Sequence, residues 1–141
     1  MDLAIGRRYH QLAVGLLAKG DIHGAEEVLV AGMDWASSLS DIPAELALLF
    51  EGQGRPRYDI IDLLSQALER DVFIEKSPAA ILEFRANQYF ETGNYSRALA
   101  DLDQLEDSES CSLLRLHIFE RMRQLGLVQA QLDAPGKEPY Q

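Results

Sequence analysis

Two stretches of the chain repeat the same pattern of large, small and turn-forming residues. The sequences AVGLLAKGDIHGAEEVL at 13–29 and ANQYFETGNYSRALADL at 86–102 align without a gap. The matched pairs are Ala13 with Ala86, Leu16 with Tyr89, Gly20 with Gly93, Asp21 with Asn94, Ile22 with Tyr95, Ala25 with Ala98 and Leu29 with Leu102. Internal repetition of this kind indicates a fold built by stacking copies of one small unit.

Each half of the repeated unit has the character of one helix. Apolar residues recur at helical spacing up to Gly20 and Gly93, and a glycine can take the left-handed conformation that ends a helix. Asp21 and Asn94 follow, and their short polar side chains can cap the free amides of a second helix. The pattern therefore predicts two helical hairpins, with alanines where the paired helices cross closely.

The rest of the sequence predicts two less regular hairpins. The middle one would have helices over 43–52 and 58–70, a lengthened turn GQGRPR at 52–57, and buried side chains at Ala47, Phe50, Tyr58, Ile61, Leu64 and Leu68. Ser77 and Pro78 mark a new helix start, and Gly126 marks the turn of a fourth unit. The predicted helices are 3–18, 21–38, 43–52, 58–70, 78–92, 95–106, 109–124 and 127–133.

We expect an all-α fold with one domain over 1–133. The segment DVFIEK at 71–76 contains strand-forming residues, but a lone strand would have nothing to pair with. Residues 134–141 include Pro135, Gly136 and Pro139, which predicts a disordered C-terminal tail.

These motifs resemble the tetratricopeptide repeat, a helix-turn-helix unit of about 34 residues. The first unit matches at Tyr9, Leu12, Ala13, Gly20, Ile22 and Ala25, and the third at Leu82, Ala86, Tyr89, Gly93, Tyr95, Ala98 and Leu105. Arg85 stands where the family usually has leucine, and both units lack the closing proline. The resemblance implies a helical-hairpin solenoid of three to four units, wound as a right-handed superhelix.

Composition and charge argue against several classes of function. The net charge of −10 disfavours nucleic-acid binding, which needs a basic surface. The longest apolar run, Leu12 to Ala18, is far shorter than the roughly 20 residues of a membrane span. At the N-terminus, Arg7 and Arg8 follow the short apolar stretch, which is the reverse of a secretory signal. With a single cysteine, Cys111, the chain is expected to be cytoplasmic.

The sequence contains no pattern typical of catalysis or metal binding. His10, His23 and His117 are too far apart for a helical metal pair, and HExxH, CxxC and GxSxG motifs are missing. The GQG at 52–54 lacks the lysine of a phosphate-binding loop. We therefore expect no cofactor, no metal and no enzymatic activity, with an enzyme or enzyme regulator kept as an alternative.

The resemblance implies that the first helix of each hairpin lines a concave surface that binds another polypeptide. The residues it places there are His10, Val14, Leu17, Leu48, Glu51, Glu83, Asn87, Phe90, Leu116 and Glu120. Because these side chains are mainly apolar or acidic, the expected partner is a protein or peptide with apolar and basic character. Glu83 and Glu91 flank Asn87 and would repel the C-terminal carboxylate that some family members bind.

Three alternatives stay open. The acidic cluster of Asp101, Asp103, Glu106, Asp107 and Glu109 is either a solvated helix end or a docking patch for a basic segment. The chain is also similar in size, charge and repeat number to bacterial type III secretion chaperones of tetratricopeptide type, which hold a translocator or needle subunit. An apolar patch of Trp35, Phe50 and Phe73 would allow a homodimer.

Overall fold

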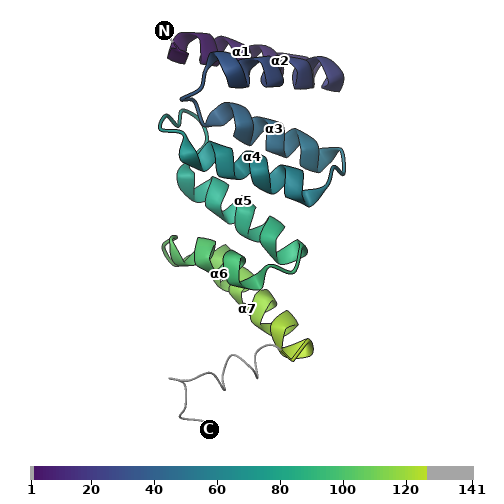
Figure 1. The fold of residues 1–141 in the computed structure, drawn as a ribbon, viewed down its shortest axis with the longest axis vertical. Helices are drawn as coiled ribbons and strands as arrows, with labels where there is room; N and C mark the ends of the chain where they lie inside the picture. The colour runs from purple at the N-terminus through teal and green to yellow at the C-terminus, as the bar shows by residue number, and fades with distance from the viewer. Residues whose placement is uncertain (1, 127–141) are drawn as a thin grey trace.

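The chain folds as a stack of antiparallel helices (Figure 1). The computed structural model describes residues 2–126, with side chains from residue 4 onward. In this range it has seven helices: α1 (Asp2–Ala18), α2 (Ile22–Trp35), α3 (Asp41–Gly52), α4 (Arg57–Glu69), α5 (Pro78–Glu91), α6 (Tyr95–Asp103) and α7 (Glu109–Gln124). The predicted all-α class is confirmed for this range. The predicted helix over 127–133 and the predicted tail over 134–141 lie outside the described residues.

Consecutive helices pair into hairpins, and the hairpins pack on one another in chain order. The most extensive contacts join α1 to α2, α3 to α4 and α5 to α6. Contacts of α2 with α3, α4 with α5, and α6 with α7 then link each hairpin to the next element. This arrangement of neighbours is the one that a stack of repeated hairpins requires. Within residues 2–126, no helix has the length and apolar character to cross a membrane.

The turns of the two repeated units follow the prediction closely. Gly20 and Gly93 both adopt left-handed conformations, with φ of 82° and 84°, which side chains with a Cβ rarely adopt. Asp21 caps α2 as predicted, because its carboxylate accepts a hydrogen bond from the Gly24 amide at 3.0 Å. Asn94 occupies the predicted position just before α6, but the expected cap bond is missing: its side-chain amide instead lies 3.4 Å from the Thr92 hydroxyl. All four crossing alanines, Ala13, Ala25, Ala86 and Ala98, are fully buried.

The end of α2 differs from the prediction, because a distant loop competes for its backbone groups. α2 stops at Trp35 rather than at residue 38. Beyond it, the Ser40 amide donates to the Val72 carbonyl at 2.8 Å, and the Val72 amide donates to the Ser38 carbonyl at 3.0 Å. The segment 71–76 therefore does find a pairing partner, through one isolated parallel bridge between Leu39 and Val72.

The end of α6 was also placed too late, at residue 106 rather than Asp103. Arg115 of α7 donates one hydrogen bond to the Leu102 carbonyl and another to the Asp103 carboxylate, each at 3.0 Å. At the end of a helix, the last backbone carbonyls lack the amide partners of a further turn. Arg115 supplies a hydrogen bond to the Leu102 carbonyl, so α6 can end at this point without leaving that carbonyl unpaired.

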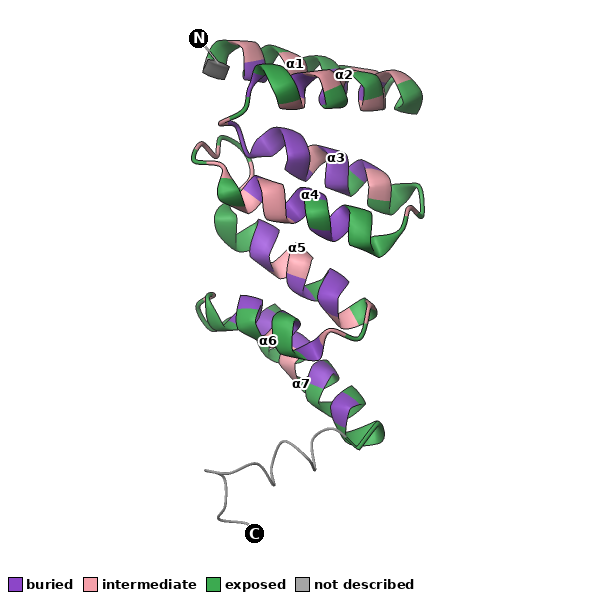
Figure 2. Cartoon of the chain, viewed as in Figure 1, coloured by how far each residue is buried: buried purple, intermediate pink, exposed green. Residues whose placement is uncertain are grey.

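The apolar core has two parts that meet where α4 packs on α5 (Figure 2). Ile81 of α5 belongs to the first part, with α1 to α4, whereas Ile61 of α4 belongs to the second, with α5 to α7. In the middle hairpin, Ala47, Ile61 and Leu64 are buried as predicted, and Phe50 and Leu68 pack partly buried against the first part. The prediction for Tyr58 was wrong, since it is 65% exposed in the first turn of α4.

Buried polar side chains connect the hairpins across this boundary. Arg85 of α5 donates to both carboxylate oxygens of Asp101 in α6, at 2.7 and 2.8 Å, and to the Ser65 hydroxyl in α4 at 3.0 Å. The buried Gln88 side chain donates to Glu51 at 3.0 Å and accepts from Arg57 at 2.9 Å. These bonds fix α5 against the middle hairpin.

A carboxylate also fixes the loop that precedes α5. Asp41, at the start of α3, is fully buried and accepts hydrogen bonds from the backbone amides of Ile74, Glu75 and Lys76, at 2.9, 2.7 and 3.2 Å. Three amides satisfy the charge of one buried carboxylate, so Asp41 holds the loop 71–77 on the first half of the stack.

Candidate functional site

The first helix of each hairpin lies on one common side of the stack. α1 contacts α3, and α5 contacts α7, whereas α2, α4 and α6 do not pack on one another to a similar extent within residues 2–126. The first helices are thus in contact within the pairs α1 with α3 and α5 with α7, while α5 meets the middle hairpin through α4. We call the surface formed by α1, α3, α5 and α7 the first-helix face.

The residues predicted to bind a partner differ widely in exposure. Val14, Leu48 and Leu116 are exposed apolar side chains on α1, α3 and α7, at 43%, 40% and 65%. Glu51, Asn87 and Glu120 are exposed, and Leu17, Glu83 and Phe90 are half-buried. Only His10 is buried.

Several of these polar groups already have partners within the chain. Glu51 accepts from Gln88, and the Asn87 amide donates to the Glu83 backbone carbonyl at 3.0 Å. Glu120 accepts from Arg123 and Gln124 on its own helix. Of the acidic residues predicted for this surface, only the Glu83 carboxylate has no hydrogen bond or ion pair recorded among the described residues.

His10 does not serve as a freely accessible binding residue, which corrects the prediction. Its Nε2 lies 3.4 Å from Oε1 of Glu45 in α3, and Lys76 Nζ lies 3.1 Å from the same oxygen. The Glu45 hydrogen bond raises the pKa of His10 above 6.5, against the opposing effect of burial. The same bond, with Lys76, lowers the pKa of Glu45 below 4.5. His10 therefore links α1 to α3, beside a small cavity of about 130 Å³.

A larger hollow opens beside the first-helix face, between the start of α5, the loop 104–108 and the start of α7. Its volume is about 610 Å³. Three carboxylates line it, from Glu83, Glu106 and Asp107. Its apolar lining comes from small or half-buried side chains, namely Ala79, Ala80, Leu105 and Cys111. We call this feature the acidic hollow.

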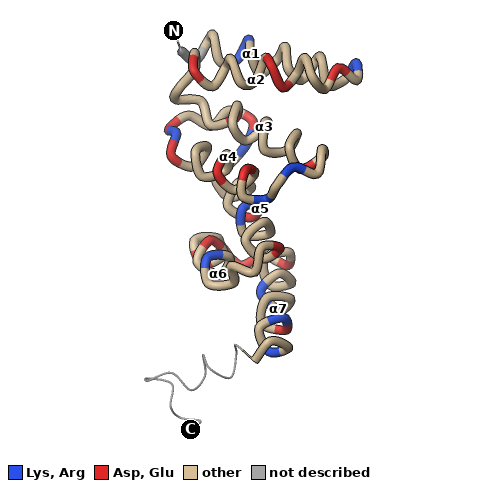
Figure 3. Tube along the Cα trace, turned by 45° about the vertical axis from the view of Figure 1, so that its right-hand side comes forward, with Lys and Arg blue, Asp and Glu red and all other residues tan. Residues whose placement is uncertain are grey.

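The acidic cluster predicted over 101–109 divides into members with different environments. Asp101 is buried against Arg85, and Asp103 pairs with Arg115 at 3.0 Å. Glu106 and Asp107 instead line the acidic hollow. They lie just before α7, whose first turn is capped by the Ser108 hydroxyl, so the positive end of the helix dipole stabilises them. Figure 3 shows that basic positions follow further along α7.

Sequence reasoning missed that Glu83 joins Glu106 and Asp107, although they lie more than twenty residues apart. The signal was present in the hairpin itself. Glu83 lies ten residues before the turn at Gly93, and Gln104 lies eleven residues after it. In an antiparallel helix pair, positions that are equally distant from the turn lie side by side. Glu83 is therefore close to Gln104, which begins the loop between α6 and α7.

No group of His, Cys, Asp and Glu side chains within 2–126 is arranged to hold a metal ion. In comparisons with known proteins, no family model matches the chain, and no curated protein matches it.

Proposed function

We propose that this chain is a non-enzymatic binding module of tetratricopeptide type that holds a basic and apolar segment of another protein. The acidic hollow beside the first-helix face is the observation that carries this proposal. Its carboxylates come from helix α5 and from the loop before α7, around an apolar lining. Such a hollow suits a lysine or arginine side chain, whose apolar stem contacts the lining while its charge meets the carboxylates.

Glu83 connects the hollow to the rest of the face. It lines the hollow, and it also lies one turn before Asn87 on the exposed side of α5. The exposed side chains Val14 and Leu48 lie further along the face, on α1 and α3. A segment laid along the face would place a basic residue at α5 and apolar residues toward α1.

The charge of the chain supports the same kind of partner. At a net charge of −10, the whole molecule attracts a basic segment, and salt weakens that attraction. A segment ending in a carboxylate would be repelled by the acidic hollow. An adaptor and a secretion chaperone would both bind such a segment on this face. The proposal therefore specifies the chemistry of the partner and not which of these two roles the chain has.

Fluorescence anisotropy tests the proposal with a labelled peptide of alternating lysine and leucine residues. The comparison peptide carries glutamate in place of each lysine. We expect the lysine peptide to bind, with an affinity that falls as salt increases, and the glutamate peptide not to bind.

The decisive variant is Glu106→Lys with Asp107→Lys, which reverses two charges in the hollow. The matched control, Glu27→Lys with Glu69→Lys, makes the same charge change at exposed positions on α2 and α4. We expect binding to weaken at least tenfold more in the hollow variant than in the control. Equal weakening in the two variants would show that the peptide senses only net charge, and the proposed site would be wrong.

A further inference from the structure

The end of the stack formed by α1 and α2 presents an apolar surface on which no other helix of residues 2–126 packs. Leu12 of α1 is 53% exposed, and Trp35 of α2 is 61% exposed. Stacked-hairpin proteins normally carry polar residues on the outer side of a terminal unit, because that side faces water. An exposed apolar surface at this position indicates an interaction site.

The packing of α2 identifies which of its side chains share this surface. One side of α2 is buried through Ala25, Leu29 and Gly32. Another side meets the middle hairpin, where Glu26 pairs with Arg55. A further flank carries Val28, Ala31 and Trp35 at helical intervals; Val28 packs partly against the core, Ala31 is half-buried and Trp35 is exposed. We define the end face as Ile5, Arg8 and Leu12 of α1 with Val28, Ala31 and Trp35 of α2.

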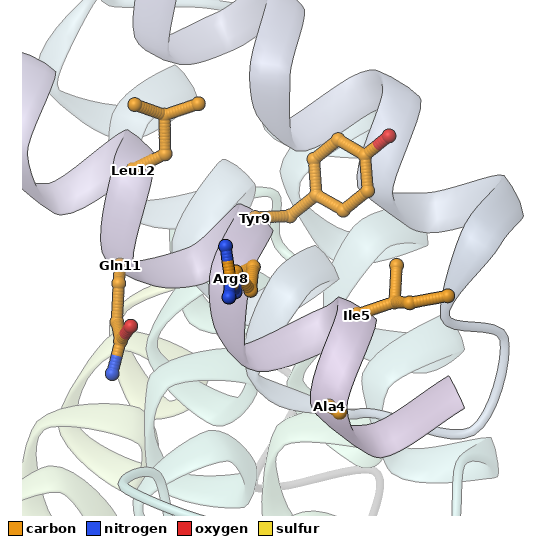
Figure 4. A pocket seen from close by; sticks show the side chains of 6 residues that line it. All are labelled: Ala4, Ile5, Arg8, Tyr9, Gln11 and Leu12. Atoms are coloured by element: carbon orange, nitrogen blue, oxygen red, sulfur yellow. The ribbon is translucent and has the colours of Figure 1, made fainter. Parts of the chain in front are cut away.

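A wide hollow follows α1 along this end of the molecule (Figure 4). Its volume is about 810 Å³, and Ile5, Arg8, Tyr9 and Leu12 are among its lining residues. Figure 4 shows Ile5, Tyr9 and Leu12 on one side of the helix and Gln11 on the other. An adjoining helix would find an apolar surface there, with a basic side chain beside it.

The two helices of the end hairpin carry net charges of opposite sign. Helix α1 contains Asp2, Arg7 and Arg8, and Lys19 follows its last residue, so the helix has a net charge of about +1. Residues 21–35 contain four acidic side chains, Asp21, Glu26, Glu27 and Asp34, with no lysine or arginine. Glu26 is paired with Arg55, so the exposed acidic side chains within α2 are Glu27 and Asp34. One hairpin therefore carries a weakly basic helix beside an acidic helix, and two such hairpins are complementary when α1 of each faces α2 of the other.

We propose that the end face binds a second copy of this chain, with α1 of each copy lying antiparallel along α2 of the other. A two-fold axis parallel to the helices produces this arrangement and makes every contact twice. The alternative two-fold pairing, α1 on α1, would place basic helices together and acidic helices together. This inference does not rest on the proposed function, because the end face lies at α1 and α2 and the acidic hollow at α5 to α7.

The hairpin fixes the register of the proposed contact. Tyr9 and Gly32 are level with each other, because a Cβ added to Gly32 would lie 3.0 Å from the Tyr9 Cβ. A two-fold rotation about an axis parallel to the helices does not change the height of a residue along that axis. Tyr9 of one copy is therefore also level with Gly32 of the other. Arg8 of one copy then lies beside Ala31 and Trp35 of the other, where its guanidinium can stack on the indole ring. Leu12 lies beside Val28.

The area of the end face sets the expected strength of association. Helix α1 is about 25 Å long, and two adjacent helices are about 20 Å wide, which gives roughly 500 Å² per copy. The total, about 1,000 Å², is at the low end for specific interfaces, so we expect a weak dimer with a dissociation constant in the micromolar range. The predicted patch of Trp35, Phe50 and Phe73 does not form, because Phe50 and Phe73 pack against the core and only Trp35 is exposed.

Analytical ultracentrifugation over a range of concentrations tests whether the full chain dimerises. We expect a reversible dimer that Leu12→Glu weakens at least tenfold. The control is Leu113→Glu, a matched change at a similarly exposed leucine on α7, which should leave the dimer intact. A wild-type chain that stays monomeric up to high micromolar concentration, or a dimer that Leu113→Glu weakens equally, would overturn the proposal.

Disulfide trapping tests the arrangement itself, in a Cys111→Ala background whose fold is verified by circular dichroism. Chains with Leu12→Cys are mixed with chains with Val28→Cys, the position that the register places beside Leu12, and then oxidised. We expect mixed disulfides between the two chains to dominate. Predominant disulfides between two Leu12→Cys chains would show α1 packing on α1, and the absence of any cross-link would also contradict the arrangement.

Discussion

The substitution Arg85→Leu would give α5 the leucine that is usual at this position of a tetratricopeptide unit, yet we expect it to destabilise the chain. Arg85 holds both oxygens of Asp101 and the hydroxyl of Ser65. The Asp101 side chain is only 4% exposed. Without the guanidinium, a nearly buried carboxylate would lose its ion-pair partner.

The expected loss is about 3–5 kcal/mol, the usual cost of removing one partner of a buried ion pair. Burying a leucine contributes at most about 1.5–3 kcal/mol, and less here because Arg85 is not fully buried. The loss therefore exceeds the gain. Replacing both residues, as Arg85→Leu with Asp101→Leu, removes the unpaired charge, so the double variant should recover most of the stability.

Urea unfolding followed by far-UV circular dichroism measures these differences. The control is Arg97→Leu on α6, an exposed arginine whose replacement we expect to change the free energy of unfolding by less than about 0.5 kcal/mol. If Arg85→Leu were as stable as the control, or if the double variant lost as much as the single variant, the Arg85–Asp101 pair would not have the role described.

Two further predictions concern the contacts around α3. Asp41→Ala leaves three backbone amides of the loop 74–76 without their acceptor, so we expect a loss of about 2–4 kcal/mol in the same unfolding assay; an unchanged midpoint would contradict this role. For His10, the raised pKa means that the Glu45 contact stabilises the fold fully below pH 6.5 and is lost as pH rises through the folded-state pKa. The lowered pKa of Glu45 means that its contribution is present above pH 4.5 and is lost as pH falls. The stability difference between wild type and His10→Gln should therefore be largest between pH 4.5 and 6.5 and should shrink at alkaline pH; a difference independent of pH would contradict it.

The parts of the fold that could be predicted from sequence are those set by local chemistry. A glycine that ends a helix and an alanine at a helix crossing act within one hairpin, so Gly20, Gly93, Ala25 and Ala98 were placed correctly. Ser77 also caps α5 as predicted, accepting from the Ala80 amide at 3.1 Å. Each of these features depends on neighbours within a few residues or on one antiparallel contact.

The parts that were missed depend on residues far apart in the chain. Asp41 binds a loop more than thirty residues away. The same loop pairs separately with the end of the first hairpin, through the bridge between Leu39 and Val72. His10 was placed on the binding surface because its spacing fits, but Glu45 and Lys76 come from other elements and enclose it. No local pattern specifies which of these polar groups meet.

The candidate site was predicted in the same uneven way. Exposed apolar positions at Val14 and Leu48 follow from helical periodicity. The two environments within the acidic cluster do not follow from periodicity. Asp101 and Asp103 differ from Glu106 and Asp107 because they pair with arginines on α5 and α7. Knowing the position of those arginines is what reduces the cluster to the carboxylates of the acidic hollow.

Hydrogen–deuterium exchange with the lysine–leucine peptide tests the central claim, that the chain binds a basic segment at the acidic hollow, most directly. The first turns of α5 and α7 border the hollow, so a peptide bound there should reduce local opening and slow exchange at their amides. We expect the peptide to slow exchange at 79–83 and 104–112, with smaller effects along α3 and none on α2. Protection confined to α2 or α4, or no protection at saturating peptide, would contradict the account.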